Sequence, residues 1–233
     1  MHLFYSPLLN GQTAPLPPEE ANHALRVLRL TRGTEVAVTD GKGNMGYGIV
    51  GEISSRECTI NISSIIPEFG RRLYKLNIAV SPLKNRDRYE WFVEKCVEIG
   101  VDTITPLVSA RTEKTNIRPD RLEKIILSAM KQSVKAYLPE LNPPTTFDSF
   151  IKQKRNTTCL IAHCNPGHRE PLPSQLKKGE DVTILIGPEG DFTPEEVAIA
   201  NSMGYISVHM GHSRLRTETA GIAACHSVYS VNI

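Results

Sequence analysis

The sequence lacks the cysteine arrangements that mark disulfide-rich and zinc-binding proteins. Its five cysteines are odd in number, widely spaced and never form a C-x-x-C pair. No apolar run approaches the roughly 18 residues that a membrane-spanning helix needs. The start, "MHLFYSPLLNG", has no cationic region and only a short, interrupted apolar stretch, unlike a signal peptide. We therefore expect a reduced protein of the cytoplasm.

Charge is nearly balanced, with 27 lysines and arginines against 25 acidic residues and a net charge of +2. This balance permits nucleic-acid binding without arguing for it, because such binding depends on clustered charge. The 233 residues, 40% of them hydrophobic, suffice for one large domain or two smaller ones with separate cores.

Two regions of different periodicity meet near "PEFGRRLYKL" at residues 67–76. Before this point, in "TEVAVTDGKGNMGYGIVGEISSRECTINISSII" at residues 34–66, apolar and polar residues alternate between glycine-containing turns. This alternating stretch predicts short antiparallel strands in a small barrel or sandwich. After it, five apolar, strand-like runs alternate with helix-period segments, which predicts an α/β unit with a mainly parallel sheet. The runs are "LYKLNIAVS", "DTITPLVS", "TCLIAHC", "VTILIGP" and "YISVHMG". We expect domains at residues 1–70 and 73–233.

Local signals place several helix ends. Asp87 and Glu90 fit a capping box, and Gly100 should end the helix that follows. Pro119 suits the first turn of another helix. A last helix should begin near Thr217.

The stretch "TILIGPEGDFTPEE" at residues 183–196 breaks an apolar strand with glycine and proline and then opens a helix. Thr193 is the expected N-cap and Glu196 its capping-box partner. Gly187 and Gly190 would let a ligand approach the backbone closely. A connection that merely needs glycine explains the same residues equally well, since Gly and Pro mark most turns.

The stretch "HMGHSRLRTETAGIAA" places two arginines, Arg214 and Arg216, beside a helix N-terminus. Thr217 or Thr219 can cap this helix, which contains Glu218. Cations there oppose the positive end of the helix, so the arrangement suits an anionic partner better than it suits stability. The structural alternative is that Arg216 pairs with one of the neighbouring glutamates, at position 218 or 189.

A third strand ends in "LIAHCNPGHRE". His163 and Cys164 invite a metal or nucleophile interpretation, but no nearby carboxylate or second cysteine supplies the remaining ligands or a base. We therefore expect structural roles for both and no metal. Three strand ends thus carry glycine-bearing loops, and such ends converge on one ligand crevice in an α/β sheet.

Together, "IGPEGDFTPEE" and "MGHSRLRTETA" resemble the paired glycine-rich signatures of SPOUT-class methyltransferases. More narrowly, the chain resembles the ribosomal RNA small subunit methyltransferase E family, which methylates uracil N3 in 16S rRNA. Further matches follow in the family's order and cover almost the whole chain: "HALRVLRLTRGTEVAVTDGKG", "KNRDRYEWFVEKCVEIGV", "SARTEK" and "SAMKQSVKAYLPELNPP".

The resemblance implies a C-terminal α/β domain with a deep trefoil knot, a PUA-like N-terminal β-barrel that helps to hold RNA, and a homodimer with each site near the partner subunit. It also implies S-adenosylmethionine as cofactor and 16S rRNA of the small ribosomal subunit as substrate. The cofactor-binding residues that it implies are Ala162, His163, Cys164, Ile186, Gly187, Pro188, Glu189, Gly190, Met210, Gly211 and Leu215.

The chain departs locally from the family's pattern. Asp191 stands where a second glycine is usual, and His212 or Ser213 where a hydrophobic residue is usual. Asp tolerates a left-handed backbone better than most residues, so the turn can survive. These departures bear on cofactor contacts and not on the class of enzyme.

Methylation at uracil N3 requires the imide proton to leave as the new bond forms, so the site must favour the deprotonated ring. Arg216 is the candidate for stabilising the anionic ring. A carboxylate or an ordered water could accept the proton. Glu189 or Glu218 is the candidate carboxylate; the sequence does not rank the two, and a structural role for either is the alternative.

Clustered cations are candidates for RNA binding. Arg26, Arg29 and Arg32 are spaced three apart and would lie near one side of a helix. The other candidates are Lys84, Arg86, Arg88, Arg111 and Lys114. A solvated surface explains any single cluster, whereas their joint presence favours a shared basic face.

Other functions also fit parts of the sequence. An RNA-binding module that has lost catalysis is one. A phosphate-binding α/β enzyme that uses the GPEG turn, residues 187–190, as an anion nest is another. No G-x-G-x-x-G or G-K-[ST] motif supports the latter. A related methyltransferase that acts on a different RNA is the alternative closest to the family interpretation.

Overall fold

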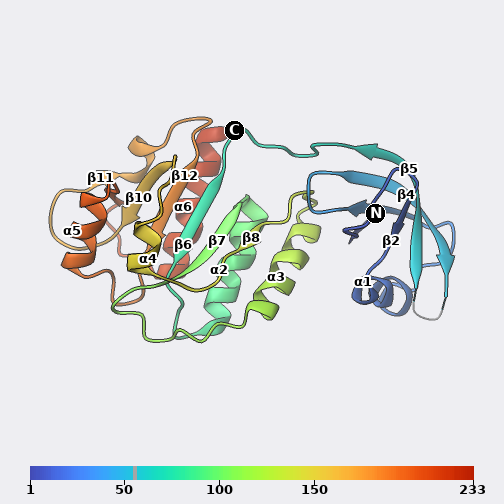
Figure 1. The fold of residues 1–233 in the computed structure, drawn as a ribbon, viewed down its shortest axis with the longest axis horizontal. Coiled ribbons are helices and arrows are strands. Elements are labelled where there is room, and N and C mark those ends of the chain that lie inside the picture. Colours follow the sequence, from blue (N-terminus) through green and yellow to red (C-terminus); the bar gives the residue numbers. More distant parts are fainter. Residues whose placement is uncertain (55–56) are drawn as a thin grey trace. The chain divides into compact units, whose positions relative to one another are not determined.

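The computed structural model describes residues 1–54 and 57–233 and divides them into two compact units (Figure 1). The first unit consists of Met1–Arg71 and Leu127–Leu138, and the second of Arg72–Ile126 and Pro139–Ile233. Ser55 and Arg56, which fall in the alternating stretch, lie outside the described residues. The domain limits 1–70 and 73–233 stay a prediction.

The first unit is built on a five-stranded sheet in the order β1-β3-β4-β5-β2. Neighbouring strands are antiparallel except β1 and β3, which are parallel. Alternate side chains of these strands form a buried core that includes Val36, Val38, Val50 and Ile60. The alternating stretch thus predicted β3, β4 and β5, which pair antiparallel as expected, whereas β1 and β2 lie outside that stretch. The strand bounds are β1 His2–Tyr5, β2 Thr13–Pro15, β3 Glu35–Thr39, β4 Met45–Ile53 and β5 Cys58–Ile66.

A short helix, α1 Pro18–Asn22, continues into the π-helical turn η1 His23–Val27. The prediction that Arg26, Arg29 and Arg32 share one side of a helix is wrong, because Arg29 has a left-handed φ of 54° beyond the end of η1. Leu28 and Leu30 both pack against the core of the first unit. Residues two apart lie on different sides of a helix, so the chain must leave the helix to bury both leucines.

The segment Leu127–Leu138 belongs to the first unit through contacts with its sheet. Ala136 packs against Ala37 and Met45, and its carbonyl accepts a hydrogen bond from the Gly43 N–H at 2.9 Å. The Lys131 ammonium forms a largely buried ion pair with the Glu20 carboxylate.

The second unit is built on a parallel sheet in the order β11-β13-β10-β12-β6-β7-β8, with β9 beside β7. Every pair in it is parallel, which confirms the α/β prediction. The five strands expected from the apolar runs are present. The bounds are β6 Leu76–Val80, β7 Thr103–Val108, β8 Glu140–Leu141, β9 Thr145–Thr146, β10 Thr158–Ala162, β11 Glu170–Pro171, β12 Val182–Ile186 and β13 Ile206–His209.

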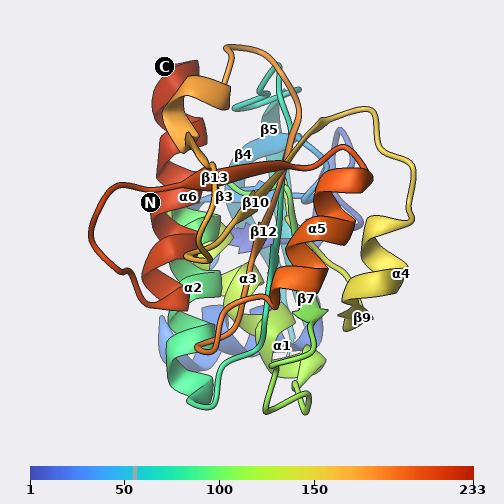
Figure 2. The same ribbon diagram turned by 90° about the vertical axis from the view of Figure 1, so that its left-hand side faces the viewer.

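Helices cover both faces of this sheet, as Figure 2 shows. On one face, α4 Phe147–Ile151 and α5 Pro194–Ser202 pack over Leu107, Ile161 and Leu185. On the other face, α6 Thr217–Asn232 contacts β6 and β12 and packs against α2 Arg86–Ile99. The remaining helices are α3 Pro119–Gln132 and the 3₁₀ helix η2 Leu172–Gln175. Within the described ranges, no helix is long and apolar enough to cross a membrane.

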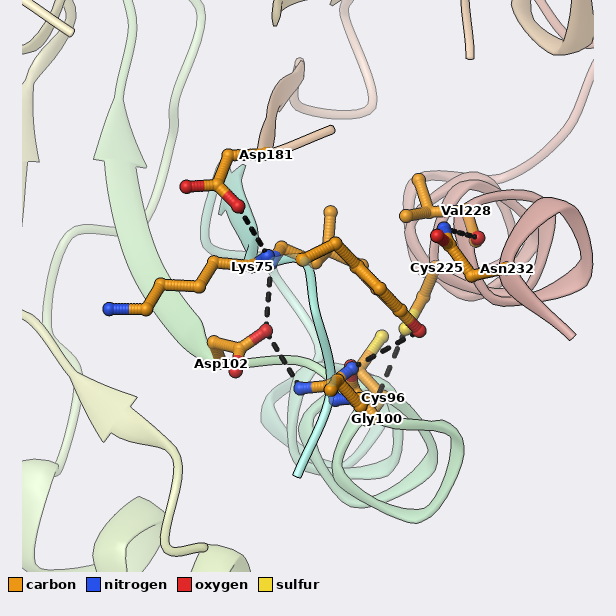
Figure 3. A network of polar contacts seen from close by, with 11 residues as sticks. Lys75, Cys96, Gly100, Asp102, Asp181, Cys225, Val228 and Asn232 are labelled. Atoms are coloured by element: carbon orange, nitrogen blue, oxygen red, sulfur yellow. Dashed lines mark hydrogen bonds and ion pairs between the residues drawn. The ribbon is translucent and has the colours of Figure 1, made fainter. Parts of the chain in front are cut away.

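Helices α2 and α6 pack closely (Figure 3). A Cβ on Gly221 would lie 2.5 Å from a ring carbon of Phe92. The Cys225 thiol donates to the Cys96 carbonyl at 3.7 Å, and burial raises the pKa of the Cys96 thiol. All five cysteines are free thiols, so these two serve the packing of the helices.

Two carboxylates hold the backbone at the start of strand β6, as Figure 3 also shows. The Lys75 N–H donates to Asp181 at 2.7 Å, and the Leu76 N–H donates to Asp102 at 2.8 Å. Burial raises the pKa of Asp102, although the neighbouring Arg72 opposes the shift. These two bonds satisfy backbone donors where the strand begins.

The predicted capping box at Asp87 and Glu90 is wrong. Asn85 is the N-cap of α2, and its side chain accepts the Asp87 N–H at 2.9 Å. Asn85 has the extended backbone that an N-cap needs, whereas Asp87 already lies inside the helix. Glu90 instead pairs with Arg121 at 2.6 Å. The predicted helix end at Gly100 and helix start at Pro119 are confirmed.

Candidate active site

Three loops of the second unit surround one cavity of about 450 Å³. They follow β13, β10 and β12, which are consecutive neighbours in the parallel sheet. The carboxyl ends of such strands meet at one edge of a sheet, which brings distant segments of the chain together there.

Most of the residues predicted to bind a cofactor line this cavity: Ala162, His163, Cys164, Ile186, Gly187, Pro188, Glu189, Met210, Gly211 and Leu215. Gly190 does not line this cavity. The predicted catalytic residues Arg216, Glu189 and Glu218 also line it. The role of each residue stays a prediction.

Gly187 is required by the packing of its own turn. A Cβ there would lie 3.0 Å from the Phe192 backbone nitrogen and 3.2 Å from the Asp191 carbonyl carbon. A Cβ on Gly190 would only touch the Arg111 side chain, at 3.4 Å. Arg111 donates from Nη1 to the Gly190 carbonyl at 2.8 Å, so this predicted RNA-binding residue braces the GPEG turn.

Asp191 links two of the three loops. It has a left-handed φ of 63°, the conformation that glycine adopts most easily. Its Oδ2 accepts the Cys164 N–H at 2.7 Å, and its Oδ1 accepts the Phe192 N–H at 2.8 Å. The carboxylate therefore gives the loop after β10 a fixed position against the turn after β12, a contact that the sequence did not reveal.

The capping box predicted at the start of α5 is confirmed. Thr193 accepts the Glu196 N–H at 3.1 Å, and Glu196 accepts the Thr193 N–H at 2.9 Å. The second oxygen of the buried Glu196 accepts the Ala110 N–H at 2.8 Å. This glutamate thus also fixes the loop that follows β7.

Nitrogen atoms of two side chains in the cavity wall, His163 and Arg169, are buried without a hydrogen-bond partner in the described part of the chain. Both ring nitrogens of His163 and the Nε of Arg169 lack a hydrogen bond within residues 1–54 and 57–233. Burial lowers the pKa of His163, which favours the neutral ring, although the Asp191 carboxylate opposes the shift. Arg169 also donates to the His163 carbonyl at 2.7 Å. Arg169 was missed by sequence reasoning, because a lone arginine in a loop carries no motif.

The charged residues at the start of α6 differ from the expected arrangement. Glu218 is buried and lies 3.8 Å from Arg88, which reaches the cavity from α2. Glu189 is exposed and accepts the Lys84 N–H at 3.1 Å. Arg216 is exposed and has no ion pair in the described part of the chain, so the alternative that it pairs with either glutamate is wrong.

The predicted threonine cap of α6 is also wrong. The N-cap is Arg216, without a side-chain hydrogen bond. The Thr217 hydroxyl instead donates to the Gly187 carbonyl at 3.1 Å. This bond joins the start of α6 to the GPEG turn, so the hydroxyl serves a contact between loops rather than the helix end.

The remaining predicted RNA-binding cations lie in several places. In the second unit, Lys84 pairs with Glu113 at 2.8 Å, and Lys114 donates to the Lys84 carbonyl at 2.9 Å. Arg86 lies in a separate depression at the start of α2. The arginines at 26, 29 and 32 are exposed on the first unit.

Comparison with known proteins places this geometry in a family. Residues 71–229 match a family model described as an RNA methyltransferase domain, and residues 16–63 match an RNA methyltransferase PUA domain. Curated relatives named ribosomal RNA small subunit methyltransferase E include those of Bacillus subtilis, 24% identical over 93% of this chain and 89% of the relative, and of Aquifex aeolicus, 27% identical over 96% of each. The chain belongs to the ribosomal RNA small subunit methyltransferase E family.

Solved structures of methyltransferases share the whole fold of this family member. A probable rRNA-methyltransferase from Porphyromonas gingivalis is 36% identical, with a TM-score of 0.92 over 100% of this chain and 98% of that one. The ribosomal RNA small subunit methyltransferase E of Neisseria gonorrhoeae, solved with S-adenosylmethionine bound, is 27% identical with a TM-score of 0.87 over 100% and 98%. The predicted fold class, a PUA-like β unit followed by a SPOUT-type α/β domain, is confirmed.

Proposed function

We propose that this protein methylates N3 of a uridine in the 16S rRNA of the small ribosomal subunit, with S-adenosylmethionine as methyl donor. The observation that carries the proposal is the single cavity that three strand-end loops form in a member of this family. The names of its relatives support an rRNA substrate of the small subunit, and a neighbour with S-adenosylmethionine bound supports the cofactor.

The residues of the cavity fit this cofactor. A volume of about 450 Å³ lies in the range of about 300–1,000 Å³ that small-molecule sites occupy. The unpartnered nitrogens of His163 and Arg169 offer hydrogen bonds to a polar ligand. The carboxylates of Glu189 and Asp191 in the wall suit its cationic sulfonium and ammonium groups. Bound here, S-adenosylmethionine supplies a methyl group activated by positively charged sulfur.

The protein's own side chains must handle the uracil proton. The exposed guanidinium of Arg216 is available to donate hydrogen bonds to the uracil carbonyl oxygens and to stabilise the deprotonated ring. We assign the proton acceptor to Glu218, because its carboxylate is buried in the wall of the same cavity that Arg216 lines. Glu189 is exposed and holds the backbone of Lys84, which suits a supporting role.

Three further properties belong to this proposal. The resemblance implies a trefoil knot in the α/β domain, a homodimer and a cytoplasmic location, where ribosomal subunits are assembled. Sedimentation equilibrium of the purified protein tests the dimer, and a mass of one chain, 25.8 kDa, at working concentration would contradict it.

Replacement of Arg216 tests the proposed site most sharply. Arg216→Ala should lower kcat much more than it weakens S-adenosylmethionine binding, because the guanidinium acts on the uracil. Arg216→Lys is the matched control and should retain part of the rate, since it keeps the charge without the planar fork. Equal loss of turnover and cofactor binding in Arg216→Ala would make the residue a cofactor or structural group.

A further inference from the structure

A shallow depression lies between the first turns of α2 and α3 in the second unit. Its floor is apolar and includes Leu83 and Leu122, both buried. Its rim carries three cations, Arg86, Lys114 and Arg118. We refer to this site as the basic depression. Its volume is about 30 Å³, which leaves room for a small anion but not for a nucleobase.

The basic depression has a surplus of positive charge. Its acidic lining residue, Glu90, is held by Arg121 through contacts of 2.6 and 2.7 Å. In the described ranges, Arg86 and Arg118 have no ion pair that would neutralise them. Lys114 donates to a neutral carbonyl and so keeps its charge uncompensated. An anion would therefore find at least two unneutralised arginines there.

Two of the cations occupy positions that disfavour them in the free protein. Arg86 is the first residue of α2, and Arg118 directly precedes α3. The N-terminus of a helix carries partial positive charge, so a cation there lowers the stability of the fold. The arrangement becomes favourable when an anion sits between the two arginines.

The basic depression lies next to the active-site cavity. The Lys114 ammonium binds the Lys84 carbonyl at 2.9 Å, and the Lys84 N–H binds Glu189 in the cavity wall at 3.1 Å. Arg88, two residues beyond Arg86, lines the cavity itself. The start of α2 thus separates the two sites, and a ligand that fills the cavity can reach the basic depression by crossing one segment of chain.

We propose that the basic depression binds a backbone phosphate of the substrate RNA close to the target nucleotide. The inference rests on the proposed function, since it takes the base in the cavity to be part of an RNA strand. Arginine pairs bind phosphate oxygens through forked hydrogen bonds, and phosphate contacts position a strand without reading its sequence. The phosphate fixes the strand while the uracil enters the cavity.

The test compares two double variants that each remove two positive charges. Arg86→Gln/Arg118→Gln, the rim variant, removes both arginines of the rim and leaves Lys114. Lys152→Gln/Lys154→Gln removes two exposed lysines beyond α4 as the matched control. Binding of small ribosomal subunits is measured for both at several salt concentrations. We expect the rim variant to bind about tenfold more weakly and its salt dependence to flatten by about one to two in log–log slope.

Two further readouts separate RNA binding from a structural role. S-adenosylmethionine affinity should stay unchanged in the rim variant, and the melting temperature should stay equal or rise, because an unfavourable interaction with both helix ends is removed. A salt slope and subunit affinity equal to those of the control variant would overturn the proposal. A loss of melting temperature together with cofactor binding would overturn it as well.

Failure of the inference is distinguishable from failure of the proposed function. Subunit binding is measured without turnover, so it reports on the basic depression even if the wild-type protein makes no 3-methyluridine. Normal formation of 3-methyluridine with unaltered binding by the rim variant would reject only the phosphate site.

Discussion

The carboxylate of Asp191 holds the backbone of Cys164, with 2.7 Å between Oδ2 and the amide nitrogen. Its other oxygen accepts the Phe192 N–H at 2.8 Å. One side chain therefore fixes the distance between two walls of the cavity. It does so from a left-handed backbone position that most side chains avoid.

Replacement of Asp191 should weaken cofactor binding without unfolding the protein. Asp191→Gly keeps the left-handed backbone but removes both acceptors. We expect a rise of about tenfold in the S-adenosylmethionine Kd, the equivalent of about 1.4 kcal/mol for lost hydrogen bonds to a charged group. Asp191→Asn should recover part of the affinity, since its amide oxygen still accepts one bond. Calorimetric titration decides, and an unchanged Kd in Asp191→Gly would show that the contact is dispensable.

The two glycines of the GPEG turn should differ in their tolerance of a methyl group. Gly187→Ala places a Cβ 3.0 Å from a backbone nitrogen, whereas Gly190→Ala meets only the flexible side chain of Arg111 at 3.4 Å. We expect Gly187→Ala to lower the free energy of unfolding by about 1–3 kcal/mol and Gly190→Ala to lower it by less. Denaturant titration of both variants checks this, and equal losses would contradict the packing explanation.

Local patterns predicted the secondary structure of the second unit well but not its long-range contacts. The capping box at Thr193 and the helix stop at Gly100 depend on neighbouring residues, so the sequence reveals them. The Thr217 hydroxyl instead bonds a carbonyl thirty positions away, and so its predicted role as a cap was wrong. The prediction that Arg29 lies in a helix was wrong for a similar reason, because burial of Leu28 and Leu30 outweighs the periodicity of the arginines.

The site was predictable in outline because parallel strands bring their carboxyl ends together. The chain positions of the three loops therefore sufficed to expect one crevice. The contribution of Arg88 to its wall could not be foreseen, since α2 reaches the cavity only through the fold. Arg169 lies in one of the expected loops, but a lone arginine there carries no motif. The partners of Glu189 and Glu218 were hidden for the same reason.

The two candidate carboxylates should respond differently to loss of charge. Glu218→Gln should lower kcat by about 10²–10⁴-fold, the usual contribution of a general base, with little change in cofactor Kd. Glu189→Gln should have a smaller effect, because an amide oxygen can still accept the Lys84 N–H. Single-turnover rates of both variants on unmodified subunits provide the comparison. A larger loss in Glu189→Gln would transfer the role of base to that residue.

Acid should destabilise the fold through His163. Burial holds the pKa of this ring below its ordinary value of 6.5, so the unfolded chain takes up the proton first. The contribution of His163 to the free energy of unfolding is fully present above pH 6.5. It is lost as the pH falls from 6.5 through the lower pKa of the folded state. His163→Gln should therefore lose less unfolding free energy than the wild type between about pH 7 and pH 5. Denaturant titrations of both proteins across this pH range measure the free energy of unfolding. An identical dependence on pH in the two proteins would contradict an origin in His163.

The most direct test is transfer of a labelled methyl group to the proposed substrate. Small ribosomal subunits that lack the modification are incubated with the protein and methyl-labelled S-adenosylmethionine, and the nucleosides are identified by mass spectrometry. We predict labelled 3-methyluridine from 16S rRNA. Unlabelled RNA, or a label on another base or on a ribose oxygen, would contradict the assignment.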